Sequence, residues 1–179
     1  MSSGAGDGGS GRDHGSAPLR ERVLSFLAEH HVVSLATAAG GEVWAASVFY
    51  AYDDLDLVFV SSPQSRHGQH IAASVRVAGT IDTQQLDWRE IRGVQLEGEV
   101  APARGAELDR TLEVYLRRFP WVADFLAPGD DDPAAAGAVP MAVDGREVAV
   151  DLYRLRPSRV LLIDNRLGFG HREELALTP

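Results

Sequence analysis

The 179-residue sequence contains no cysteine and no lysine. Without cysteine the chain cannot form disulfides, thiolate metal sites or a cysteine nucleophile, so its composition gives no sign of an oxidising compartment. All 17 cationic side chains are arginine, which excludes Schiff-base chemistry and a covalently attached pyridoxal phosphate. Every fixed positive charge is therefore a planar guanidinium, suited to bidentate hydrogen bonds with carboxylates and phosphates.

The sequence also lacks a long apolar run and an excess of basic residues. No stretch approaches the ~20 apolar residues of a membrane span, and residues 1–17 have no apolar centre of the kind found in a signal peptide. A net charge of −9 opposes binding to nucleic acid or to an anionic membrane, because both require a broad basic surface. We expect a cytoplasmic protein that binds neither nucleic acid nor membrane.

The length and the 45% hydrophobic content fit one domain with tails. Residues 1–17, mainly Gly, Ser and Asp, predict a disordered tail, and residues 18–175 predict the domain. Residues 127–145 contain three aspartates followed by proline, alanines and glycine. We expect them to form a mobile insertion loop rather than a metal site, because no spacing there fixes the geometry of ligands.

The hydrophobic pattern predicts more strands than helices. Apolar residues recur at helical spacing after Pro18 and again from Ala106 to Phe119, where Pro120 ends the helix. Alternating or apolar runs predict strands over residues 32–38, 42–52, 55–60, 75–82, 91–101, 148–155 and 159–164. Short connections favour antiparallel pairing. The expected fold is mainly β (α+β), an antiparallel barrel with peripheral helices.

Acidic residues are absent from one stretch of this acidic chain. Residues 57–81 contain no Asp or Glu, although a window of that length would hold roughly 3.6 by chance. The same stretch carries two arginines and two histidines: Arg66, His67, His70 and Arg76. A local cationic pocket in an anionic protein indicates an anionic ligand.

Ser65 stands between a predicted strand and a predicted short helix over residues 66–73. The free amides of a first helical turn and the positive end of the helix dipole favour anions. Together with Ser65 and Arg66 they could hold a phosphate. The competing interpretation is an ordinary serine N-cap beside a surface arginine. His67 and His70 lack further ligands nearby in the sequence, so we expect no metal site.

Six blocks follow one another along the chain: 31–35 (HVVSL), 44–50 (WAASVFY), 65–67 (SRH), 91–98 (IRGVQLEG), 117–120 (RRFP) and 164–170 (DNRLGFG). In this order they resemble the YhbP-like branch of the FMN-binding split-barrel superfamily, which also contains pyridoxamine 5'-phosphate oxidase. The resemblance covers about residues 19–173. It implies a homodimer of six-stranded antiparallel split barrels, with FMN in a groove between the subunits.

Residue by residue, Ser65 and Arg66 match the first two positions of the family's phosphate-binding Ser-Arg-Lys. His67 stands where the lysine would be. An imidazole has an ordinary pKa of ~6.5, so we expect cofactor affinity to weaken as the pH rises above neutrality. Ser61 matches a residue near the ribityl-phosphate end of the cofactor.

Ser47 and Val48 match positions whose backbone borders the flavin ring in relatives, with ordinary strand packing as the alternative. Gln95 alternates with apolar neighbours, so it could offer its amide to the pyrimidine edge of the flavin or simply face solvent. Asn165 and Arg166 match the start of the family's Asn-Arg-Leu-His-Asp-Arg, whose histidine and second arginine are absent here. That loss disfavours pyridoxine chemistry. Arg166 either meets an anionic substrate or forms an ion pair with Asp164.

The resemblance implies an FMN-dependent oxidoreductase that acts on a small molecule, with NADH or NADPH as the electron donor. The flavin itself carries the electrons, so the absence of a catalytic constellation in the sequence does not argue against an enzyme. Three alternatives stay open. The first is an enzyme of the same fold that uses the deazaflavin F420, and the second is a non-enzymatic flavin- or haem-binding protein. The third is an interaction domain whose pocket holds no cofactor.

Overall fold

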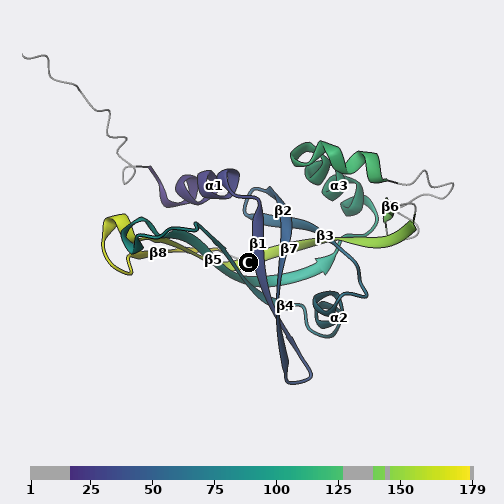
Figure 1. Ribbon diagram of the computed structural model, residues 1–179, viewed down its shortest axis with the longest axis horizontal. Helices are drawn as coiled ribbons and strands as arrows, with labels where there is room; N and C mark the ends of the chain where they lie inside the picture. Colours follow the sequence, from purple (N-terminus) through teal and green to yellow (C-terminus); the bar gives the residue numbers. More distant parts are fainter. Residues whose placement is uncertain (1–16, 127–138, 144–145, 178–179) are drawn as a thin grey trace, which may run out of the picture.

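The computed structural model describes residues 17–126, 139–143 and 146–177. Its centre is a closed antiparallel barrel in which the strands pair in the order β3-β2-β1-β4-β5-β7, and β3 returns to pair with β7 (Figure 1). The mainly β, six-stranded barrel predicted from the sequence is therefore confirmed. Its strands are β1 (Val32–Ala39), β2 (Glu42–Asp53), β3 (Asp56–Ser61), β4 (Arg76–Asp82), β5 (Arg92–Pro102) and β7 (Arg146–Asp164).

Two further strands extend the sheet along β7. β6 (Val139–Val143) and β8 (Arg172–Ala176) pair with its two halves. The expectation of a loop is wrong for residues 139–143, because the buried Val139 pairs with Val150 in an edge strand, a place that tolerates Pro140. The other residues of the expected insertion, and the expected tail up to residue 16, lie outside the described residues.

The strand β7 also differs from the expectation. Two separate strands were predicted on either side of Arg156 and Pro157, but β7 runs through both residues without a break. β5 accommodates them by a register shift between Glu97 and Gly98. One long strand can thus pair with β3 and with β5 in succession, which closes the barrel.

Within the described residues, three α-helices lie around the barrel: α1 (Leu19–Glu29), α2 (Arg66–Ala73) and α3 (Ala106–Arg118). Arg118 fixes the end of α1, since its guanidinium donates to the carbonyl oxygens of Leu27 and Ala28 at 2.9 and 3.3 Å, and to that of His30. Charged donors of this kind satisfy the last carbonyls of a helix and complement its dipole. Among the described residues, no helix is long and apolar enough to cross a membrane.

Alternate residues of β2, β3 and β7 face two different cores. Tyr50 and Phe59 point into the barrel, where they pack with side chains of α1 and the other strands. Their neighbours Ala51 and Val58 point outward and pack under α3 and the following 3-10 helix η2 (Pro120–Phe125). Burial on both faces explains why the run from Leu57 to Val60 in β3 is apolar without interruption.

Gly98 lies at a close backbone contact in the seam between β5 and β7, where the two strands pair. A Cβ at this position would lie 2.2 Å from the carbonyl oxygen of Arg156 and 2.7 Å from the Cα of Pro157. Both are backbone atoms, so the strands would have to move apart. We predict that Gly98→Ala lowers the free energy of unfolding by about 1–3 kcal/mol, measured by urea denaturation.

Gly79→Ala on β4 is the matched control. Its Cβ would meet only side-chain ends, those of Leu96 and Val33, at 3.2 Å. These can shift, and we expect a change within about 1 kcal/mol. Equal losses for the two variants would contradict the role assigned to the seam.

Candidate functional site

The candidate site begins where β3 ends and α2 starts. The Ser65 hydroxyl accepts a hydrogen bond from the amide of Gly68 at 3.1 Å and donates to the carbonyl oxygen of Ser62 at 2.7 Å. Ser65 is therefore the N-cap of α2, as the simpler interpretation of the sequence predicted. A Cβ on Gly68 would lie 2.6 Å from that Ser62 oxygen, so glycine lets the loop lie directly against the first turn. The cap leaves other first-turn amides without a partner inside the helix.

Ser61 and His67 join Ser65 in one cluster. The Ser61 hydroxyl lies 2.5 Å from Nε2 of His67 and 3.3 Å from the Ser65 hydroxyl. His67 is half-buried, and this burial lowers the pKa of its imidazole below the ordinary value. The structure thus brings three predicted residues together as a serine–histidine cluster (Ser61, Ser65, His67). The lowered pKa favours the neutral form of the His67 imidazole.

Arg66 points away from this cluster toward the hairpin between β1 and β2. Its guanidinium forms an ion pair with Glu42 at 2.6 Å and lies 4.7 Å from the centre of the Trp44 ring. Gly40 and Gly41 form the tight turn of the hairpin with φ of 58° and 84°. Glu42 and Trp44 are 24 and 22 positions before Arg66. The two strands predicted over residues 32–38 and 42–52, joined by a short connection, indicated this hairpin, but nothing in the sequence indicated that it reaches α2.

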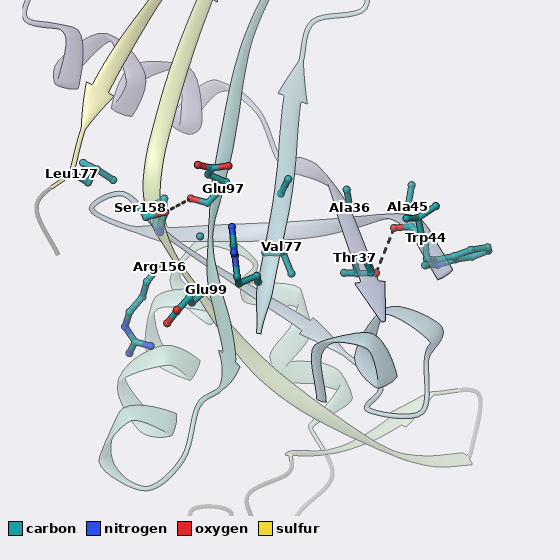
Figure 2. Close-up of a pocket in the computed structure, with 16 residues that line it drawn as sticks. Ala36, Thr37, Trp44, Ala45, Val77, Glu97, Glu99, Arg156, Ser158 and Leu177 are labelled. Carbon is teal, nitrogen blue, oxygen red and sulfur yellow. Dashed lines mark hydrogen bonds between the residues drawn. The ribbon is translucent and has the colours of Figure 1, made fainter. Parts of the chain in front are cut away.

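A groove of about 1240 Å³ lies on the outer face of the sheet, and Trp44 is among the residues that line it. Figure 2 shows Trp44 and Ala45 on one side of the groove and Glu99 and Arg156 on the other. Small side chains from three strands line the groove: Ala36, Ala38, Ala45 and Ala78. Such a surface lets a flat group approach the strands closely.

A row of polar side chains crosses the outer face beside the groove. Ser47 pairs with Ser34, Ser34 with Thr80, and Thr80 with Gln95. The hydroxyls of Ser34 and Ser47 are 3.0 Å apart. A second hollow of about 340 Å³ is lined by Ser34, Thr80 and Gln95. It borders the groove, because Ala36, Ala78 and Glu97 line both. We call this set, Ser47, Ser34, Thr80 and Gln95, the polar row.

The polar row joins two of the predicted ring contacts. Ser47 and Gln95 come from strands that are not neighbours, and the register aligns them on one face. Val48 differs, because its side chain packs against the core inside the barrel. Only its backbone is available to a ligand on the outer face. The register therefore adds Ser34 and Thr80, which sequence reasoning missed because pairing partners are not visible in a single sequence.

Asn165 and Arg166 belong to the 3-10 helix η3 (Asn165–Leu167), directly after the end of β7. Arg166 forms two hydrogen bonds with the buried Asp164, at 2.9 and 2.7 Å. Burial opposes ionisation of Asp164, yet the bonds from Arg166 hold the pKa of this carboxyl below its ordinary value. The Asn165 amide donates to the carbonyl oxygen of Trp88 at 2.8 Å. Within one chain the ion-pair alternative is observed, and the substrate role of both residues stays a prediction.

The family described as pyridoxamine 5'-phosphate oxidase matches residues 19–148. A UPF0306 protein of Enterobacter sp. (strain 638) is 33% identical over 152 residues, which span 84% of this chain and 91% of that protein. The UPF0306 protein YhbP of Salmonella paratyphi A is 32% identical over 149 residues, 82% of this chain and 86% of YhbP.

Solved structures agree on the fold. A heme binding protein from Mycobacterium smegmatis has a TM-score of 0.68 at 20% identity, over 89% of this chain and 58% of that one. A FAD-binding protein from Mesorhizobium loti has a TM-score of 0.57 at 19% identity, over 80% of this chain and 92% of that one. These likenesses establish the architecture alone, and they include one flavin-binding and one haem-binding protein. The match to the family and the identity to the YhbP proteins confirm the resemblance seen in the sequence: the chain belongs to the pyridoxamine 5'-phosphate oxidase family, in its UPF0306 branch.

Proposed function

We propose that this protein binds FMN and acts as an oxidoreductase on a small molecule, with NADH or NADPH as the electron donor. The observation that carries the proposal is the cluster of Ser61, Ser65 and His67 at the start of α2, the helix whose first residue is Arg66. A phosphate placed there meets helix amides, hydroxyls, a guanidinium and an imidazole that can take up a proton. The chain's membership of a family named for a flavin-type oxidase supports the same choice.

The residues present fit the remainder of an FMN molecule. β2 runs from Ala45, which follows Trp44, to Ser47 in the polar row, a distance of roughly 7 Å at 3.3 Å per residue, and both side chains lie on the outer face. The outer face thus offers small side chains next to the phosphate end and hydrogen-bonding groups further along. In the polar row, serine hydroxyls and the Gln95 amide can meet the polar edge of a flavin ring. A planar ring would lie over the alanines that line the groove.

A bound flavin supplies the electron transfer, so the chain's own residues need only bind it, orient it and limit its contact with water. The serine–histidine cluster and Arg66 hold the phosphate in this proposal. The polar row orients the ring, and the groove leaves one face of the ring open to a substrate. A homodimer, which the family resemblance implies, would cover the outer face and enclose the ring.

The first prediction concerns Arg66. We expect Arg66→Ala to weaken FMN binding roughly ten- to a hundred-fold, because one charged hydrogen bond contributes about 1.5–3 kcal/mol. Riboflavin, which lacks the phosphate, should lose little. Flavin fluorescence titration of both ligands gives the comparison. Equal losses would make Arg66 a structural residue, and tight binding of F420 with none of FMN would replace the cofactor.

The second prediction concerns pH. Burial lowers the pKa of His67 in the free protein, whereas a bound phosphate favours the charged imidazole and raises that pKa. Binding therefore takes up a proton, and FMN affinity should fall as the pH rises from about 6.5 to about 8.5.

Two variants of His67 control for other titrating groups. His67→Lys keeps its charge across this range and should bind FMN with a nearly constant affinity. His67→Gln should also be flat, but weaker than the wild type at the acid end. A wild-type affinity that does not change with pH would exclude the uptake of a proton by His67.

The third prediction concerns the reaction. Protein loaded with FMN and mixed with NADH or NADPH in the absence of oxygen should lose the absorbance of oxidised flavin, and oxygen should restore it. The rates should saturate with the nicotinamide concentration, as expected for a bound donor. A flavin that stays oxidised with both donors would favour a non-enzymatic carrier.

A further inference from the structure

The cation of the proposed phosphate site already has an anionic partner within the chain. Nη2 of Arg66 lies 2.6 Å from Oε2 of Glu42. Glu42 is the first residue of β2, directly after the turn formed by Gly40 and Gly41. The hairpin projects beyond the barrel past α2 (Figure 1), and so carries Glu42 to the start of that helix.

Trp44 holds the same guanidinium from a second direction. The Arg66 guanidinium carbon is 4.7 Å from the centre of the Trp44 ring, within the range of a cation–π contact. The ring is on the hairpin two residues after Glu42. The hairpin therefore offers Arg66 two partners, the aromatic face of Trp44 and the carboxylate of Glu42. Arg66 has a defined position without any ligand.

The ion pair between Arg66 and Glu42 can compete with a ligand for the guanidinium, and a ligand of higher charge can displace the carboxylate. The side chains of Arg66 and Glu42 are 42% and 66% exposed, and ion pairs this exposed contribute little to stability. Glu42 brings one negative charge, whereas a phosphate monoester near neutral pH brings about 1.5 to 2. An anion with a single charge would replace the Glu42 carboxylate at Arg66 with no gain in electrostatic attraction. A phosphate monoester gains more from Arg66 than the carboxylate does.

We infer that Glu42 is an internal competitor for the phosphate, which occupies Arg66 in the free protein and reserves the site for ligands that carry a phosphate monoester. The inference rests on the proposed function, because it assumes that Arg66 contacts a phosphate. It assigns a role in ligand selection to a hairpin residue outside the Ser-Arg-His segment. Removal of the Glu42 charge should therefore strengthen the binding of FMN.

The experiment compares FMN and riboflavin by fluorescence titration at pH 7.5 and low salt. Glu42→Gln keeps the shape of the side chain and removes its charge. We expect FMN to bind about three- to five-fold more tightly to this variant, the upper limit for an exposed ion pair, with riboflavin unchanged within about two-fold. In the Arg66→Ala background, Glu42→Gln should have less than half of this effect, because the competition acts through Arg66.

Glu113→Gln on α3 is the matched control. Glu113 forms an exposed ion pair of the same kind, with Arg117 at 2.7 Å, and its loss changes the net charge equally. It should leave both affinities unchanged. An equal gain in both variants would reduce the effect to net charge and overturn the inference.

Two further outcomes separate the inference from the proposed function. If Arg66→Ala weakens FMN binding but Glu42→Gln does not strengthen it, Glu42 is no competitor and the proposed function stands. If the wild type binds FMN no more tightly than riboflavin, the phosphate site itself is wrong and both proposals fall.

Discussion

The pairing of β3 with β7 is the constraint on which the rest of the structure depends. It closes the sheet, removes the two edges that an open sheet would expose, and ends at the pair Ser61 and Asp151. The chain leaves the barrel immediately after Ser61. The start of α2 must therefore lie close to the end of β3. Closure therefore sets the position of the serine–histidine cluster.

The same closure determines what can lie on the outer face. The register of a closed barrel is fixed around the whole ring, since a slip of one residue would turn every inward side chain outward. The row of Ser47, Ser34, Thr80 and Gln95 is a consequence of this register. A site built from single residues on four strands can be accurate only because the core holds each strand in place.

Much of this arrangement could be predicted from the sequence. The rest depends on contacts between distant segments, which a local sequence pattern does not specify. Alternation and turn residues predicted the strands that the barrel uses, and Ser65 was correctly expected before α2 because capping is a local property. The contact of Arg66 with Glu42 depends on the direction of a hairpin in space, which no local pattern specifies. The strand β6 was missed because an edge strand with a proline gives a weak signal.

The two basic side chains of the site share one property: neither presents an uncompensated positive charge while no ligand is bound. Burial lowers the pKa of His67, which favours its neutral form, and the carboxylate of Glu42 pairs with Arg66. In a chain with net charge −9, a permanent cationic pocket would attract any small anion or acidic segment. A pocket whose charge develops only against a phosphate would avoid this, because in the proposed binding mode the ligand itself favours the protonated imidazole and displaces the carboxylate. The presence of His67 in place of the lysine of the family's Ser-Arg-Lys would therefore change the selectivity for phosphate as well as the strength of binding.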